Sequence, residues 1–323
     1  MFGAASKLVP SQGEWQVSLS YRGLESDVHY SGSERQHQRE TLGTYVVNTQ
    51  QALDIGVSYT ATDRLSFSLG VPLVESSWAV PTPIRPVPGP RAKQEASGLG
   101  DISLTGRYWA FAPESRHNVS LGLGVKAPTG EHDATQEYPN IDGTNSAVKA
   151  VDQSVQPGDG GWGILFDVQA FRHLGKATLF ASGTYLANPR DTNGTPSIIV
   201  GLGLAATPGY AEERLLVNSV PDQYLVRMGA VAPLGRSGLG ASLAYRVEGL
   251  PRYDLIGDSH GWRRPGYEMF VEPGILYSKG GTTWTLNVPI GFYRNRLANP
   301  YSGREGDATF PDFIVLTGLA YRF

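Results

Sequence analysis

The sequence of 323 residues contains no cysteine, which excludes a disulfide framework, a thiolate metal site and a cysteine nucleophile. No stretch approaches the roughly 20 consecutive apolar residues that a membrane-spanning helix needs. Charged residues make up only 18%, the net charge is −3, and no run of lysine and arginine offers a phosphate-binding patch. No nucleic-acid partner is therefore expected, and any membrane span must consist of strands.

The first residues, MFGAASKLVPSQGEW, lack the basic region and apolar core of a signal peptide. The chain is therefore either cytosolic or numbered from a processed or recombinant form, and we favour the second interpretation. We expect residues 1–13 to form a tail and residues 14–323 to form one folded unit.

The abundant feature of the sequence is an alternation of apolar and polar residues. In the last segment, the odd positions from Phe313 to Phe323 carry apolar or aromatic side chains, except for Thr317, while the even positions include Asp312 and Arg322. Successive side chains of a strand point to opposite faces, so this segment predicts an amphipathic strand. The pattern recurs along the chain and predicts twelve strands.

The predicted connections fall into two classes that alternate strictly. Short turns are expected at 61–64, 112–115, 173–176, 234–238 and 278–281, and long loops near 23–43, 75–97, 129–160, 188–221, 251–264 and 297–307. Five prolines in the second long loop argue against a central strand there, because proline lacks the N–H that a ladder needs. Fourteen strands result if Ile198–Ala206 and Arg214–Val220 form an extra hairpin.

Loops segregated by length with an even strand count are typical of outer-membrane barrels, whereas a β-sandwich has little reason for this arrangement. In lipid every backbone N–H and C=O must be paired, so strands can span only as a closed ring. We therefore predict an all-β fold, a transmembrane antiparallel up-and-down β-barrel of 12 strands (alternatively 14), in the bacterial outer membrane. Its tail, residues 1–13, would be periplasmic, and membrane lipid and lipopolysaccharide would surround the barrel.

The alternation also assigns side chains to the two faces of the barrel. Ten charged residues are predicted to line the lumen, either as a constriction that selects solutes or as a purely structural network: Asp101, Arg107, Lys126, Asp167, Arg227, Arg246, Glu248, Glu268, Glu272 and Arg322. Aromatic residues near strand ends are predicted to lie at the membrane interface: Trp15, Tyr59, Tyr108, Trp284 and Tyr321.

Several segments carry a family resemblance. Gly98–Asp101, Asn118–Gly130, Pro157–Asp159, Ser219–Arg227, Glu248–Gly257, Arg263–Tyr267, Glu272–Gly274 and Arg294–Arg296 resemble the outer-membrane family named for the meta-pathway of phenol degradation (MetA-pathway) over residues 40–323. The resemblance implies a barrel that passes small or hydrophobic compounds, although the family's name does not establish phenol as a substrate. The final Phe323 resembles the terminal residue that outer-membrane barrels use as an assembly signal, which implies contact with the assembly machinery.

Enzymatic and cofactor chemistry find little support in the sequence. The Gly-x-Gly runs beginning at Gly98, Gly122 and Gly201 neither open a helix nor carry the Lys-Ser/Thr of a phosphate loop. The six histidines show no recurring spacing to serine or acidic residues, and Glu131-His132-Asp133 is interpreted as a solvated loop cluster rather than a metal site. We predict no catalytic residue, no metal and no cofactor.

The predicted function is that of a porin-like channel for the passive passage of small molecules, hydrophobic or aromatic ones included. The alternative is a plugged barrel that acts as a scaffold or receptor for a periplasmic or surface protein. The loop arginines Arg263, Arg264 and Arg296 are candidates for the outer mouth, although the sequence does not fix their positions.

Overall fold

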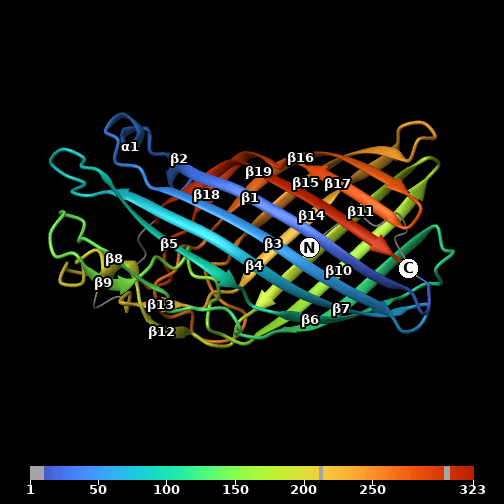
Figure 1. Ribbon diagram of the computed structural model, residues 1–323, viewed down its shortest axis with the longest axis horizontal. Helices are drawn as coiled ribbons and strands as arrows, with labels where there is room; N and C mark the ends of the chain where they lie inside the picture. Colours follow the sequence, from blue (N-terminus) through green and yellow to red (C-terminus); the bar gives the residue numbers. More distant parts are fainter. Residues whose placement is uncertain (1–10, 211–213, 302–305) are drawn as a thin grey trace.

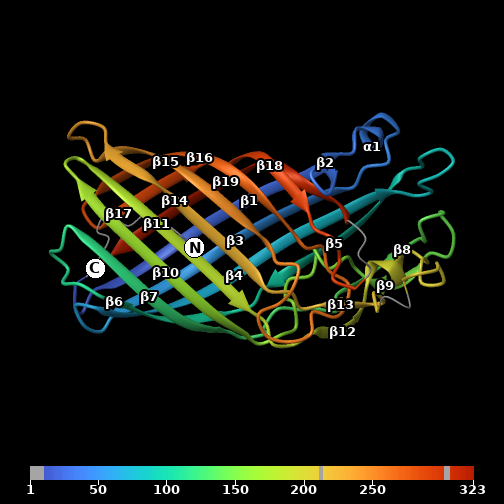
Figure 2. The same cartoon turned by 180° about the vertical axis from the view of Figure 1, so that it is seen from behind.

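The chain forms a closed ring of strands. The computed structural model describes residues 11–210, 214–301 and 306–323, and within these residues it shows an all-β, 12-stranded antiparallel barrel (Figures 1 and 2). The short connections lie at one end, here called the turn end. The long connections lie at the other, here called the loop end (Figure 1). The predicted fold and the strand number are therefore confirmed, and residues 1–10 of the predicted tail lie outside the described residues.

Ten of the wall strands are continuous and two are interrupted. The continuous strands are β1 (Trp15–Ser31), β3 (Val47–Thr60), β4 (Leu65–Pro81), β7 (His117–Lys126), β10 (Gly163–Leu174), β11 (Ala177–Ala187), β14 (Gln223–Pro233), β15 (Leu239–Leu250), β16 (Gly266–Lys279) and β19 (Asp307–Arg322). The interrupted ones are β5 (Arg91–Leu99) with β6 (Ser103–Trp109), which share β4 as a neighbour, and β17 (Thr282–Asn287) with β18 (Ile290–Arg296), which share β16.

Sequence explains one of these interruptions and a loop contact marks the other. Between β17 and β18 lie Val288 and Pro289, and proline has no N–H to donate to the ladder. Between β5 and β6 the carboxylate of Asp101 accepts hydrogen bonds from the backbone N–H groups of Gly130 and Asp159 at 3.0 and 3.2 Å. A loop-end connection is thereby tied into the wall at this point.

The barrel closes where its first and last wall strands pair. The register runs from Gln16 opposite Arg322 to Ser31 opposite Asp307, with two irregularities near Ser26. At the turn end, Trp15 and Phe323 exchange two backbone hydrogen bonds of 2.9 and 3.0 Å. The strand predicted from the terminal alternation is therefore the one that seals the ring.

The outer surface is apolar and the inner surface is polar, as strand β7 illustrates. Val119, Leu121, Leu123 and Val125 are exposed, up to 68% for Leu121, whereas Ser120 between them is fully buried. The predicted interface aromatics are likewise exposed on the wall near the turn end: Trp15, Tyr59, Tyr108, Trp284 and Tyr321. Such a surface suits hydrocarbon outside and water inside.

The wall is taller at the loop end than the sequence predicted. The expected long connection at 75–97 is wrong, because β4 continues to Pro81, β5 begins at Arg91, and these segments pair in register. Outward side chains there are polar, such as Glu75 and Glu95, so the alternation that marks the lower strands is missing. The expected loop at 23–43 is shortened in the same way, because β1 runs to Ser31.

The loop end carries the remaining elements, which are short. They are β2 (Glu34–Arg35), α1 (His37–Thr41), β8 (Thr135–Tyr138), β9 (Ala147–Ala150), β12 (Thr192–Pro196), α2 (Ile198–Gly201) and β13 (Val217–Ser219). The 14-strand alternative is therefore wrong: Ile198 and its neighbours form a helix whose buried side chains face the interior, not a lipid-facing hairpin. Among the described residues, neither helix has the length or apolarity to cross a membrane.

Candidate functional site

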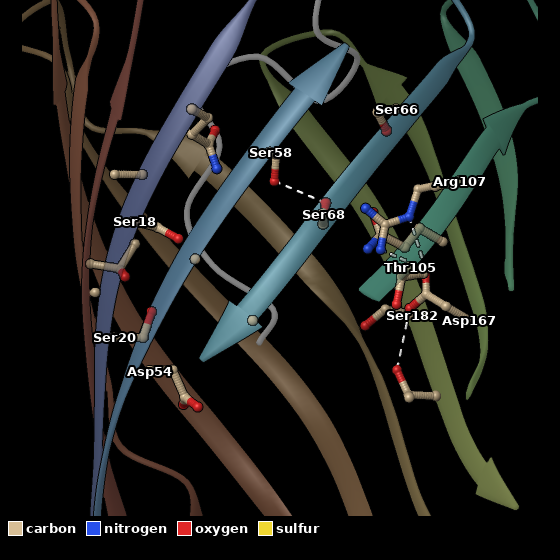
Figure 3. A pocket seen from close by; sticks show the side chains of 18 of the residues that line it. Ser18, Ser20, Asp54, Ser58, Ser66, Ser68, Thr105, Arg107, Asp167 and Ser182 are labelled. Atoms are coloured by element: carbon tan, nitrogen blue, oxygen red, sulfur yellow. Dashed lines mark hydrogen bonds and ion pairs between the residues drawn. The ribbon is translucent and has the colours of Figure 1, made fainter. Parts of the chain in front are cut away.

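The turn-end half of the lumen is a cavity of about 550 Å³ with a hydroxyl-rich wall. Serines and threonines occupy inward positions of neighbouring strands, and Ser58 and Ser68 share a 2.8 Å hydrogen bond (Figure 3). Trp109 and Phe171, with ring centroids 5.8 Å apart, line the same cavity. Small polar side chains leave space in this half, so water and small solutes can occupy it.

One ion pair faces this cavity from the wall between β6 and β11. Arg107 donates from Nε and Nη2 to Oδ1 of Asp167 at 2.9 and 2.7 Å, and Thr184 donates to Oδ2 at 3.2 Å. A methyl group at Gly122, which lies between them on β7, would approach Cβ of Asp167 to 2.9 Å. The inward glycine therefore makes room for the pair, and the Gly122-Leu123-Gly124 run belongs to a strand as expected.

A larger charged cluster lies deeper in the lumen. Arg227 of β14 contacts Glu272 of β16 at 2.6 Å, and Arg246 of β15 contacts Glu248 through Nε at 2.8 Å and Glu272 at 3.6 Å. Arg22 of β1 reaches Glu248 at 2.6 Å, although β16, β17–β18 and β19 lie between β1 and β15 around the ring. This last pair spans the lumen and narrows it.

The ten predicted lumen residues lie inside the barrel, and each belongs to an ion pair. Besides the pairs above, Lys126 lies 3.4 Å from Asp101 and also contacts Asp159, Glu268 lies 2.9 Å from Arg294, and Arg322 lies 2.7 Å from Glu14. Whether they select solutes stays a prediction. The partners missing from the predicted set include Arg22, Asp159 and Arg294. Arg22 follows the same alternation as the predicted residues of the other strands, next to Tyr21 on the opposite face, and the other two stand in the quoted family segments.

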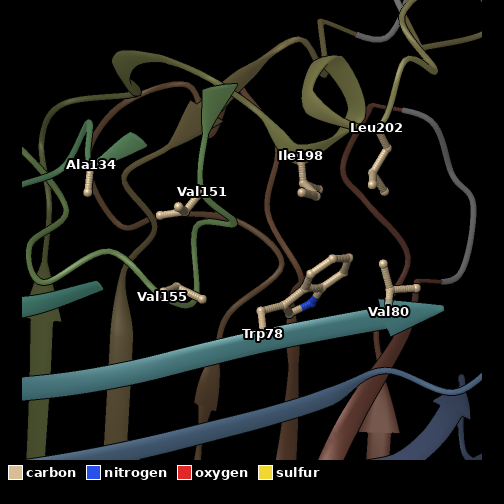
Figure 4. Packing of buried hydrophobic residues seen from close by; sticks show 7 residues of the cluster. All are labelled: Trp78, Val80, Ala134, Val151, Val155, Ile198 and Leu202. Carbon is tan, nitrogen blue, oxygen red and sulfur yellow. The ribbon is translucent and has the colours of Figure 1, made fainter. Parts of the chain in front are cut away.

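The loop-end half of the lumen is a cavity of about 1080 Å³ beneath the structured loops. Residues 127–162, 188–210 and 214–222, here called the cap, fold over this half and pack an apolar cluster against β4 (Figure 4). The cluster consists of Trp78, Val80, Ala134, Val151, Val155, Ile198 and Leu202. The two cavities share Pro72, Asp101, Leu165 and Thr184 in their walls, so they adjoin.

Polar contacts hold the cap in place. Arg264 donates to Asp152 at 2.9 Å, and the N–H of Asp152 donates to Gln94 of β5 at 2.7 Å. Burial opposes ionisation of Asp152, but the charge and hydrogen bonds of Arg264 hold its pKa below the ordinary value. Burial raises the pKa of Asp159, with Lys126 acting in the opposite direction.

The three loop arginines named from the sequence lie around one cavity. Arg263, Arg264 and Arg296 all line the loop-end cavity. Arg263 donates to Asp254 at 2.8 Å, whereas among the described residues Arg296 donates only to the backbone oxygens of Arg264 and Thr309, at 3.1 and 2.7 Å.

One cluster of possible metal ligands occurs in the described part of the chain. Asp191, Asp258 and His260 bring one ligand atom each to within 4.8 Å of the others. His260 is already engaged, because its Nδ1 lies 3.4 Å from Asp191 and its Nε2 lies 3.2 Å from a nitrogen of Arg214. The guanidinium beside the imidazole disfavours a cation there.

Comparison with known proteins supports the same architecture. A family model described as "Putative MetA-pathway of phenol degradation" matches residues 35–169, which confirms the resemblance over that range; the quoted segments beyond Asp159 lie outside it. A search among curated proteins gives no match.

Solved structures resemble the whole chain. An outer membrane channel from Pseudomonas putida F1 superposes with a TM-score of 0.63 at 12% identity over 100% of both chains. The translocator domain of the autotransporter NalP from Neisseria meningitidis gives 0.47 at 12% identity over 98% and 91%, and a Pseudomonas aeruginosa FadL homologue gives 0.47 at 8% over 96% and 90%. Only the first has a TM-score above 0.5, and at 12% identity it carries an argument about the fold alone.

Proposed function

We propose that this chain is a bacterial outer-membrane channel through which small molecules, including hydrophobic and aromatic compounds, pass passively. The observation that carries the proposal is a closed ring with an apolar exterior that encloses two adjoining cavities along its axis. Water in the lumen and pairing between side chains keep the inward charges stable. The resemblance to an outer membrane channel and to a family named for phenol degradation supports the same function.

The narrowing by Arg22 and Glu248 gives the test of this proposal. In planar bilayers and in liposome-uptake assays, the purified barrel should conduct and admit small solutes. The double variant Arg22→Ala/Glu248→Ala should conduct several times better, because it removes both partners of the pair that spans the lumen, while Arg246 keeps its contact with Glu272. A folded barrel that neither conducts nor admits solutes, as wild type or as the double variant, would contradict a channel.

A matched control is available on the outer wall. Lys93 and Glu95 form an ion pair on β5 in which both side chains are more than half exposed. The double variant Lys93→Ala/Glu95→Ala removes the same types of charge without touching the lumen, so its conductance should equal that of wild type.

The cap supports a second candidate, a plugged barrel that acts as a receptor. Its apolar cluster is buried beneath the loop end, with Val151 and Val155 fully inaccessible. Such a barrel would bind a periplasmic or surface protein and would show no solute flux. Stoichiometric recovery of such a protein with a non-conducting barrel would favour this function over the channel.

A hydrolase has less support from the geometry. His29 is buried beside Asp307, with Nδ1 2.7 Å from the carboxylate, as in a catalytic pair. Its Nε2, however, accepts the backbone N–H of Val46 at 2.8 Å. The nitrogen that would activate a nucleophile is therefore occupied, and we assign His29 to bracing the loop end.

Contacts with lipid, lipopolysaccharide and the outer-membrane assembly machinery belong to the same proposal. The apolar wall supports contact with both kinds of lipid, and the turn-end aromatics support contact with the membrane interface at that end. Phe323 is 63% exposed at the turn end, where an assembly factor can reach it.

A further inference from the structure

One cation in the wall of the loop-end cavity forms no ion pair with a described carboxylate. The other arginine and lysine side chains in its wall each form an ion pair: Arg22, Arg39, Lys126, Arg246, Arg263 and Arg264. Among the described residues, Arg296 donates only to two backbone oxygens and lies with its guanidinium carbon 3.9 Å from the ring centroid of Phe310. The more distant carboxylates of Glu268 and Asp307 favour its charge but do not contact it, so the guanidinium can still bind an anion directly.

The donors around this cation are incompletely used. Nε of Arg296 is buried and has no acceptor in the part of the protein that the structure describes. Each Nη carries two hydrogens and makes one hydrogen bond. Trp262 lines the same cavity, and its buried Nε1 also lacks an acceptor among the described residues. A planar carboxylate matches a guanidinium fork geometrically.

An apolar surface lies beside these donors. The ring of Trp262 packs against the cluster that holds Trp78 and Ile198. The guanidinium of Arg264 lies 5.4 Å from the centroid of the Trp262 ring, and the backbone oxygen of Arg264 accepts a hydrogen bond from Arg296. Charged donors and an apolar wall thus meet in one cavity of ligand-binding size, about 1080 Å³.

We propose that the loop-end cavity binds an amphiphilic monocarboxylate, such as an aromatic acid, with its carboxylate on Arg296 and Trp262 and its apolar body against the cap cluster. The proposal rests on the channel function, because the cavity lies on the path through the barrel. A guanidinium that contacts no described carboxylate matches a monoanion. A neutral hydrocarbon would fill the apolar side but leave the Arg296 and Trp262 donors buried without acceptors, which is unfavourable.

Equilibrium binding to the purified, folded barrel tests the proposal with benzoate and benzyl alcohol, two probes that share a ring and differ in charge. Wild type should bind benzoate at least about tenfold more tightly, the effect expected of a charge-assisted hydrogen bond. Arg296→Gln should abolish this preference and leave benzyl alcohol binding within twofold. Arg236→Gln, in the exposed turn at the opposite end, should change neither affinity.

A second variant keeps the test decisive if Arg296→Gln fails to fold. Trp262→Phe retains the ring and removes the Nε1 donor, so it should weaken benzoate binding severalfold and leave benzyl alcohol unchanged. Equal affinity of wild type for the two probes, or a benzoate preference that persists in Arg296→Gln, would overturn the proposal. Binding without flux would overturn the channel alone, whereas flux without a benzoate preference would overturn only this inference.

Discussion

The two halves of the lumen differ in what fills them, although the same ring of strands surrounds both. The turn-end half has a wall of hydroxyls, with Arg107 paired to Asp167, and an open space of about 550 Å³. The loop-end half is larger, about 1080 Å³, and is covered by loops that pack an apolar cluster on Trp78. The lower half follows from local alternation, whereas the upper half depends on segments distant in sequence that pack together.

Removal of Trp78 should produce the largest difference in stability between the two halves. Trp78→Ala empties the centre of the cap cluster and should cost about 3–5 kcal/mol of cap packing, while the paired strands persist. We expect rapid proteolysis of residues 127–162, higher conductance, and an unchanged heat-dependent shift of the barrel in SDS gels.

An exposed tryptophan at the same end supplies the control. Trp162 is 64% exposed, so Trp162→Ala should leave the cap resistant to protease. If Trp78→Ala unfolded the barrel together with the cap, the two halves would form one cooperative unit and the comparison would fail.

A methyl group in the lower half should have an intermediate effect. In Gly122→Ala the new Cβ would lie 2.9 Å from Cβ of Asp167, so overpacking should cost about 1–3 kcal/mol and loosen the Arg107 pair. Barrel stability in denaturant should fall, while protease resistance of the cap stays the same.

The matched variant for this prediction is Gly98→Ala on β5. Its Cβ would meet only Pro157, at 3.9 Å, which is an ordinary contact. Similar losses of stability in Gly98→Ala and Gly122→Ala would show that strand propensity, rather than the space beside Asp167, accounts for the inward glycine.

Acidification should have the smallest effect on the stability of the cap, and only well below neutral pH. The pKa of Asp152 is lowered in the folded cap, so its ion pair with Arg264 stabilises fully above the unfolded value of about 4 and is lost as pH falls further. Protease protection of the cap should therefore hold from neutral pH to about pH 4.5 and decline below about pH 4.

Two variants separate the titrating groups. Asp152→Asn should remove the decline in acid. Asp159 acts with the opposite sign, because its raised pKa makes protonation favour the folded cap as pH falls, so Asp159→Asn should steepen the decline. If protease protection of the cap depended on pH in the same way in wild type and Asp152→Asn, the Asp152–Arg264 pair would not be the contact that is lost in acid.

The lower barrel could be predicted from sequence because each strand carries its own signal. In β7 the exposed Leu121 and buried Ser120 stand next to each other in the chain, so parity alone assigns their faces. The same parity placed Arg246 and Glu272 inside. The alternation could not predict which inward charges pair with each other. Arg22 and Glu248 are 226 positions apart in the sequence, and only the closed ring brings them together.

The upper barrel was missed for two physical reasons. Outward residues such as Glu75 and Glu95 are polar, because this part of the wall rises beyond the apolar belt, so its strands lack the alternation that marks a lipid-facing wall. The apolar segment at Ile198 lacks a strand's period of two, and its burial depends on Trp78 and Val151, which no local pattern connects to it.

The seam between β1 and β19 has a consequence for biogenesis. Every other pair of neighbouring wall strands is consecutive along the chain. The β1–β19 pair joins the first wall strand to the last, so it can form only when the sixteen residues of β19 are in place. Until then two free edges expose N–H and C=O groups that lipid cannot satisfy, and each is a template for pairing with a foreign strand. Closing this seam is therefore the single step that satisfies both free edges at once.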